Sequence, residues 1–587
     1  MRRALVAGAL AVLLVSCHKK STASFSLLEE DFVFSMLAFS PVSASAQGYH
    51  SDPQRDFDTA LDDMSMAALD GRRSYLSAFH LRLAEVDKQT LSPEDRADYD
   101  TIQDLIANEL FDLDIAQSWR HNPTLYVESV GAALFNPYVL NYAPPAERAK
   151  HIIARLQKVP IFFDQADRNL FAAPPMWIQV ARQENQGNIE LVDKTLRPFI
   201  PEGQRADYDR AAMSALVALR SFDSFLADTL PNKVRGGKVP DWRLGQDNYK
   251  TKFRFALGTD QSPDEVLAGA ESDLKRVRAE MNELSKRILQ ARGKTPAGDP
   301  AADIAAALAL VAEKKSTVST YFSDARSDLA EAKSFAEQKH LLTLPARGNL
   351  QVIETPAFLR GIYAVGGFNP APALQPELGA FYWITPIPSA WEKSRIESKL
   401  REYNFYNLKL LTIHEAMPGH YVQFEFANDV QPKTRRVLRG VWGNTPYVEG
   451  WAQYITQVML DRGYLDGAPE LRLTFLKQEL RVIANAILDI RLQTNRMTDR
   501  QAMDLMEKDT FQEHEEATAK LQRAQLSSAQ LPAYFVGWRD WRRVRAQYEK
   551  AKGTGFQEAA FHDAALKEGA VPLPVLYRLL TGKELAR

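Results

Sequence analysis

The chain is poor in cysteine, with a single residue, Cys17, among 587. A lone cysteine excludes an intrachain disulfide framework and any metal site built from several thiolates. A metal would therefore need ligands from His, Asp or Glu. Net charge is also close to zero, because 72 Lys and Arg residues face 74 Asp and Glu residues. Such a chain lacks the positive field that gathers phosphates, and we expect no nucleic-acid partner.

Apolar runs of about 18 residues, long enough to cross a membrane, are missing throughout the chain. The N-terminus carries Arg2 and Arg3, followed by a shorter apolar run that ends in Leu-Val-Ser-Cys at residues 14–17. This arrangement is typical of a bacterial lipoprotein signal, in which Cys17 receives the lipid. A plain signal peptide with an incidental thiol is the alternative, and both interpretations predict export.

These features predict a lipoprotein signal peptide with its lipobox in residues 1–17 and a tether in residues 18–30, which are rich in Ser and Lys. The mature protein is expected to be held at the membrane by lipid on Cys17, on the periplasmic side or at the cell surface.

Signatures of several other chemistries are absent from the sequence. No GxSxG nucleophile motif is present, and the Gly-Lys-Thr at residues 293–295 lacks the first glycine of a phosphate-binding loop, where Ile288 stands. Glycoside hydrolysis by a pair of carboxylates is not excluded by the sequence, because a sequence does not show how far apart two acids lie.

Strand signals are scarce and helix signals dominate. Residues 92–95 (SPED) and 262–265 (SPDE) each place a capping Ser before Pro and two acids, which predicts a helix start. Apolar residues then recur every three or four positions over residues 267–288, which predicts a long amphipathic helix. Residues 379–385 (GAFYWIT) are the best strand candidate. We therefore expect a mainly α protein with a small β-sheet.

The residues best suited to chemistry are His414, Glu415 and His420. A helical zinc motif places its two histidines four residues apart, with a glutamate between them as general base. Here the histidines are six apart, and six steps of about 100° turn the second ring by about 240° away from the first. Pro418 and Gly419 lie between them and would let the helix break, so that His420 could swing back.

Two imidazoles leave a catalytic zinc one protein ligand short. Glu449, in VEGWAQY at residues 448–454, begins another helical run and would complete a site of the two-histidine, one-glutamate type. A glutamate at a helix start also serves simply as a partner of the helix dipole, so spacing alone leaves both interpretations open.

Several segments together resemble a bacterial family catalogued as domain of unknown function 885, which is placed among zincin-like metallopeptidases. The resemblance covers most of the mature chain. The segments that carry it are SPVSASAQGYH at residues 40–50, HEAMPGHYVQ at 414–423, VEGWAQY at 448–454 and FHDAALKEGAVPLPVL at 561–576.

The resemblance implies a large helical body of the gluzincin type, with a small sheet beside the active-site helix. It implies Zn²⁺ bound by His414, His420 and Glu449, with Glu415 as the catalytic base. It also implies an exported lipoprotein, in agreement with Cys17. We accordingly expect an N-terminal helical region at residues 31–345 and a zinc-binding catalytic region at residues 346–587.

Three positions depart from the family pattern. Tyr421 and Thr456 stand where the family usually has His and Glu, and a DxGxH-like motif beginning at Asp489 ends in Gln493 without its Gly and His. These departures predict a substrate preference that differs from that of typical family members. Tyr534, three residues before a glycine, is a candidate to donate to an oxyanion during catalysis or is a packed aromatic residue.

The sequence thus predicts an exported zinc-dependent hydrolase, most simply a metallopeptidase in which Glu415 activates water. Residues 379–385 were expected to offer a strand edge to a peptide substrate. A non-catalytic binding lipoprotein that retains the fold and a zinc amidase acting on non-protein amides are the alternatives. The sequence gives no substrate sequence and no choice between exopeptidase and endopeptidase.

Overall fold

The computed structural model describes the chain except for residues 1–19, 234–240, 361–362, 364 and 587. Cys17 and the predicted signal peptide lie outside the described residues. Helices make up most of the described part, and three strands form its sheet. The expected mainly α fold with a small sheet is therefore confirmed. None of the described helices is both long and apolar enough to cross a membrane.

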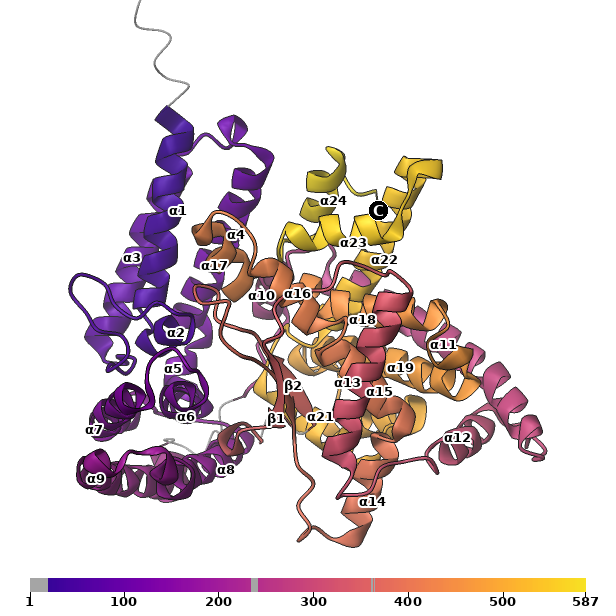
Figure 1. Cartoon of the computed structure of the whole chain (residues 1–587), viewed down its shortest axis with the longest axis horizontal. Helices are drawn as coiled ribbons and strands as arrows, with labels where there is room; N and C mark the ends of the chain where they lie inside the picture. The colour runs from indigo at the N-terminus through magenta and orange to yellow at the C-terminus, as the bar shows by residue number, and fades with distance from the viewer. Residues whose placement is uncertain (1–19, 234–240, 361–362, 364, 587) are drawn as a thin grey trace, which may run out of the picture.

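The first group of helices lies on the left of Figure 1, in indigo to magenta. Two hydrophobic cores hold this group, one among α1, α3 and α4 and the other among α6 to α9. The helices are α1 (Lys20–Ala38), α2 (Pro41–Ala46), α3 (Met66–Ala84), α4 (Pro93–Phe111), α5 (Ser118–His121), α6 (Thr124–Val139), α7 (Pro145–Asn169), α8 (Pro175–Glu190) and α9 (Arg205–Ser224).

The predicted tether at residues 18–30 is wrong for its described part, which belongs to α1. Phe25 and Phe32 are fully buried, and the Phe32 ring lies 4.9 Å from that of Phe79 in α3. The prediction followed the Ser and Lys content of the segment and overlooked its apolar residues at helical spacing. The burial of these apolar residues stabilises the packing of α1 against α3.

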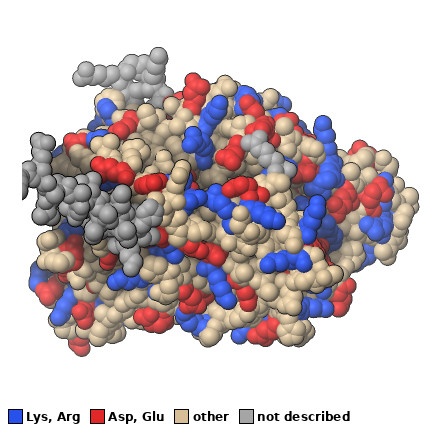
Figure 2. All heavy atoms as spheres, turned by 90° about the horizontal axis from the view of Figure 1, so that it is seen from above, with Lys and Arg blue, Asp and Glu red and all other residues tan. Residues whose placement is uncertain are grey.

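The remaining helices follow in chain order: α10 (Gln246–Leu257), α11 (Pro263–Ala291), α12 (Pro300–Val311), α13 (Tyr321–Gln338), α14 (Lys393–Glu402), α15 (Phe405–Glu415), α16 (His420–Ala427), α17 (Lys433–Val441), α18 (Thr445–Asp461), α19 (Pro469–Gln493), α20 (Asp499–Asp504), α21 (His514–Leu526), α22 (Pro532–Lys552), α23 (Glu558–Lys567) and α24 (Leu573–Thr581). Helices α10 to α12 share a core with α19, so packing runs across residue 345 rather than breaking there. Acidic and basic side chains intermingle over the face seen in Figure 2.

Both predicted helix starts are present. The Ser92 hydroxyl accepts a hydrogen bond from the Asp95 amide at 3.0 Å, and Ser262 forms a reciprocal capping box with Glu265. Helix α11 then buries Met281, among other apolar residues, on one face, as its amphipathic spacing predicts.

The sheet contains β1 (Leu350–Glu354), β2 (Gly366–Asn369) and β3 (Ala380–Ile384) in the order β1-β3-β2. Strand β3 confirms the predicted strand, and every residue in it is buried. It pairs in parallel with β1 and antiparallel with β2, so both of its edges are occupied. The expectation that this strand offers an edge to substrate is therefore wrong, because edge positions belong to β1 and β2.

Two contacts position the helices that carry His414 and Glu449. The Tyr382 hydroxyl of β3 lies 3.1 Å from the Thr412 hydroxyl of α15, which ties the sheet to that helix. Helices α18 and α22 cross with their backbones in contact, since a Cβ atom added to Gly450 would lie 2.3 Å from the carbonyl carbon of Gly537. This close approach brings the start of α22 beside the helix that carries Glu449.

Candidate metal centre

The helix break predicted at Pro418 and Gly419 is present. Helix α15 ends at Glu415 and α16 begins at His420. The Gly419 amide donates to the Ile413 carbonyl oxygen at 3.0 Å, so the connection folds back over the last turn of α15. As a result the two imidazole centroids of His414 and His420 lie 4.7 Å apart with their planes nearly perpendicular.

The tight connection depends on glycine and on a tryptophan from α18. A Cβ atom on Gly419 would lie 2.0 Å from the His414 carbonyl oxygen, closer than any side chain allows. The Trp451 indole nitrogen donates to the carbonyl oxygens of Pro418 and Gly419, at 3.2 Å each. Helix α18 therefore holds in place the loop that delivers His420.

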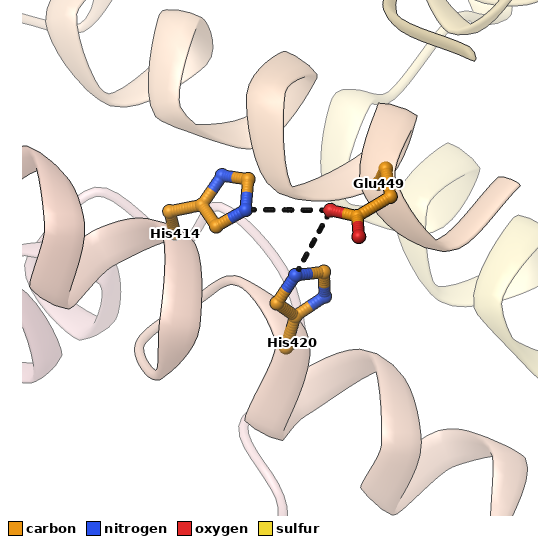
Figure 3. Close-up of side chains that lie close together, drawn as sticks. All are labelled: His414, His420 and Glu449. Carbon is orange, nitrogen blue, oxygen red and sulfur yellow. Dashed lines mark ion pairs between the residues drawn. The ribbon is translucent and has the colours of Figure 1, made fainter. Parts of the chain in front are cut away.

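Three side chains converge on one point, as Figure 3 shows. The Glu449 Oε2 atom lies 3.5 Å from His414 Nε2 and 3.4 Å from His420 Nε2. One ligand atom from each residue falls within 4.8 Å of the others. Two ligands that each lie about 2.0–2.1 Å from a tetrahedral ion are about 3.3 Å apart, so the observed spacing matches a metal site.

The polar atoms of this cluster are poorly satisfied without an ion. Among the described residues, neither Glu449 Oε2 nor His420 Nδ1 has a hydrogen-bond partner, although both atoms are buried. Burial alone would raise the pKa of Glu449, but the imidazoles of His414 and His420 together outweigh this effect and hold that pKa well below its usual value. A buried, ionised oxygen facing two imidazole nitrogens is the donor set that a divalent metal completes.

Gln453, also on α18, contributes to the orientation of His414. Its carboxamide nitrogen lies 3.4 Å from His414 Nδ1, on the side of the ring away from Glu449. Such outer contacts fix which ring nitrogen faces a metal. One helix thus supplies the acidic ligand and the contacts that position both histidines.

Glu415 and Tyr534 line the same pocket as His414. The Tyr534 ring stacks on the His414 ring with centroids 6.4 Å apart, and its hydroxyl accepts a hydrogen bond from Arg523 at 3.2 Å. Burial raises the pKa of the Tyr534 hydroxyl above its ordinary value, so the group keeps its proton at neutral pH. It is available as a hydrogen-bond donor.

The three positions that depart from the family pattern have structural partners. The Tyr421 hydroxyl donates to Asn349 at 2.9 Å, and the Thr456 hydroxyl donates to the Ala452 carbonyl oxygen at 2.7 Å. Gln493 is buried and donates to the Ser527 carbonyl oxygen at 2.9 Å. Tyr421, Thr456 and Gln493 therefore each have a structural role in the fold.

Sequence reasoning missed the basic side chains of the pocket, Arg481, Lys520 and Arg523. They lie on α19 and α21, where basic residues at helical spacing usually indicate a solvated face. Trp451 and Gln453 were also missed as positioning residues, although both lie within VEGWAQY. His514 is exposed on α21, as expected.

Comparison of structures gives two close matches in fold. A protein from Shewanella oneidensis described as a lipoprotein of unknown function is 27% identical, with a TM-score of 0.76 over 95% of this chain and 99% of that chain. A lipoprotein from Colwellia psychrerythraea is 18% identical, with a TM-score of 0.75 over 96% and 99%. Metallocarboxypeptidase 1 from Trypanosoma cruzi is 11% identical with a TM-score of 0.41 over 96% and 97%, a likeness too low to carry an argument.

Comparison of sequences identifies the family. No curated protein matches the chain. The profile of a family described as bacterial protein of unknown function, DUF885, matches residues 41–580, which include both histidines, Glu449 and Tyr534. Because this match spans nearly the whole chain, the protein belongs to the bacterial family DUF885.

Proposed function

We propose that the protein is an exported zinc-dependent hydrolase that cleaves peptide bonds. One observation carries this proposal: two imidazoles and a carboxylate converge at ligand spacing beside a pocket that also holds Glu415 and Tyr534. Metal sites with two His and one Glu, and room for a further ligand, are typical of zinc hydrolases.

His414, His420 and Glu449 would hold the metal. A bound zinc supplies Lewis acidity, which lowers the pKa of a bound water and polarises the scissile carbonyl. The arrangement of ligands fits this group because the orphaned Glu449 oxygen and the two imidazole nitrogens face one another.

The chain's own residues would handle the protons. The Glu415 carboxylate accepts a proton from the attacking water and donates it to the leaving amine nitrogen, so the base is regenerated when the C–N bond breaks. The Tyr534 hydroxyl donates a hydrogen bond to the carbonyl oxygen as negative charge develops there. Arg523, which donates to the Tyr534 oxygen, orients that hydroxyl.

The first test measures metal and activity together. Purified protein should contain about one zinc per chain, and digestion of a mixed peptide library should stop on addition of a chelator and resume on addition of Zn²⁺. Mass spectrometry of the products follows the digestion. Peptide cleavage that persists in the chelated, zinc-free protein would contradict the proposal.

We also propose that lipid on Cys17 anchors the protein at the membrane. The Leu-Val-Ser-Cys ending supports this, as does the 27% identical relative described as a lipoprotein. Cys17→Ser should move the protein from the membrane fraction to the soluble exported fraction, or leave it uncleaved, because the lipid supplies the anchor. Fractionation followed by immunoblotting measures this, and an unchanged membrane fraction would contradict it.

A further inference from the structure

A group of basic side chains faces the candidate metal centre across the same pocket. Arg481 on α19 and Lys520 and Arg523 on α21 line it together with Glu415 and Tyr534. Lys520 and Arg523 are three residues apart, which places both on one face of α21. Helix α21 thus presents positive charge to the place where a substrate would be cleaved.

Arg481 is already neutralised by partners within the protein. Its guanidinium forms an ion pair with Glu516 and donates to the Tyr403 hydroxyl at 2.8 Å. Arg523 differs, because it donates to neutral oxygens only, Tyr534 at 3.2 Å and Gln530 at 3.3 Å. Within the described part of the chain, no acidic side chain forms an ion pair with Arg523.

Lys520 is the least satisfied of the three. Lys520 is 6% exposed, and within the described part of the chain no hydrogen bond or ion pair to its amine is found, although the more distant carboxylates of Glu516 and Glu449 partly favour its charged form. Burial lowers the pKa of Lys520 well below its ordinary value, and the neighbouring Arg481 and Arg523 lower it further. A buried amine in this setting is costly to the fold unless an anion enters the pocket beside it.

We propose that Lys520 and Arg523 form a subsite for the C-terminal carboxylate of a peptide, so that the enzyme acts as a carboxypeptidase. This inference rests on the proposed peptidase function and names its substrate class. A carboxylate that enters the pocket favours the protonated form of Lys520, so Lys520 and Arg523 then offer two adjacent cationic donors to its two oxygens.

The position of the subsite supports cleavage near a chain end. Arg523 contacts Tyr534, and the Tyr534 ring stacks on the metal ligand His414. Tyr534 therefore connects a carboxylate bound at Arg523 to the metal ligand His414 through two direct contacts. A peptide held there would present one of its last bonds to Glu415.

The charge of the pocket also decides which chain end it accepts. The positively charged amino terminus of a peptide would meet the Arg523 guanidinium and be repelled, and it would disfavour protonation of Lys520. A carboxylate would instead be attracted by Arg523 and would favour the protonated form of Lys520. Exopeptidase action from the amino terminus is disfavoured on the same grounds.

The test uses one peptide sequence with either a free C-terminal acid or a C-terminal amide. The wild-type enzyme should release the last residues of the acid with kcat/KM about 10² or more above that for the amide. Lys520→Met, which keeps the length of the side chain without its charge, should lower kcat/KM for the acid by about 10- to 100-fold and leave the amide nearly unchanged. Lys508→Met removes an exposed lysine that does not line the pocket and should behave as wild type.

Two further measurements separate a binding role from a structural one. Calorimetry with a Glu415→Gln protein should show tighter binding of the acid than of the amide, and addition of Lys520→Met should remove the difference. Lys520→Met should also raise Tm, because it removes a buried amine whose desolvation costs stability. Lys520→Gln serves as a second variant if the first does not fold.

The outcomes distinguish this inference from the proposed function. Equal cleavage of acid and amide by the wild type, or loss of both substrates in Lys520→Met, would overturn the carboxylate subsite and leave the peptidase standing. A preference for peptides with an acidic side chain, even when their C-terminus is amidated, would also overturn it. If the zinc-loaded wild type cleaves neither peptide and the Glu415→Gln protein binds neither, the peptidase proposal itself has failed.

Discussion

Glu415→Gln is expected to lower peptide hydrolysis by about 10²- to 10⁴-fold while bound zinc and Tm stay at the wild-type values. The carboxamide has nearly the same shape as the carboxylate but cannot accept a proton from water. Glu415 lines the pocket beside His414 and is not one of the three side chains that converge on the metal position. The loss should therefore fall on kcat rather than on metal affinity.

The matched control is Glu377→Gln, which makes the same change on an exposed residue outside the pocket. It should retain wild-type rates. Zinc content measured on both variants separates the loss of a base from the loss of a ligand. Hydrolysis by Glu415→Gln at the wild-type rate would exclude Glu415 as the base.

The same assay distinguishes the alternative functions. A zinc-loaded wild type that binds peptides but cleaves nothing across a broad panel of peptides and amides would favour a binding lipoprotein that retains the fold. Cleavage confined to non-protein amides would favour an amidase. In either outcome the cluster of His414, His420 and Glu449 would serve a function other than peptide hydrolysis.

Local sequence rules accounted for much of the fold. Ser262 and its following acids predicted the start of α11, because a capping box is a local arrangement. The strand β3 was predicted from the aromatic and β-branched residues of its segment. Its central position was not, since strand order depends on pairing between segments that lie far apart in the chain.

The candidate metal centre was predictable because it too depends largely on local sequence. The break at Pro418 and Gly419 follows from the backbone chemistry of those two residues, and the family resemblance pointed to Glu449. The supporting contacts were not predictable from spacing, because the hydrogen bonds from Trp451 join segments more than 30 residues apart. Lys520 gave no signal at all, since a lysine on an amphipathic helix is normally exposed and only tertiary packing buries it.

Replacement of any one of the three proposed metal ligands is expected to remove most of the bound zinc and, with it, the hydrolysis. The variants are His414→Ala, His420→Ala and Glu449→Gln, and the last keeps the size of the side chain while removing its charge. A site with three protein ligands loses both geometry and affinity when one is missing. Zinc content per chain is the direct measurement.

Thermal stability provides a second measurement that does not depend on a substrate. Ligand binding to the folded state stabilises it by about 2.7 kcal/mol when free ligand is at 100 times its Kd. Addition of Zn²⁺ to the zinc-free wild type should therefore raise Tm, whereas the three ligand variants should show little or no rise. His514→Ala, which removes an exposed histidine on α21, should respond to Zn²⁺ as the wild type does.

His420→Ala is the most informative of these variants, because His420 reaches the centre only through the break between α15 and α16. Its Nε2 atom lies 3.4 Å from Glu449 Oε2, and its Nδ1 atom is buried without a partner among the described residues. If zinc is lost on this substitution and retained in His514→Ala, the folded-back connection delivers a true ligand. If His420→Ala binds zinc at full stoichiometry and zinc still raises its Tm, the third ligand must come from another residue. The convergence of the three side chains would then have a structural role only.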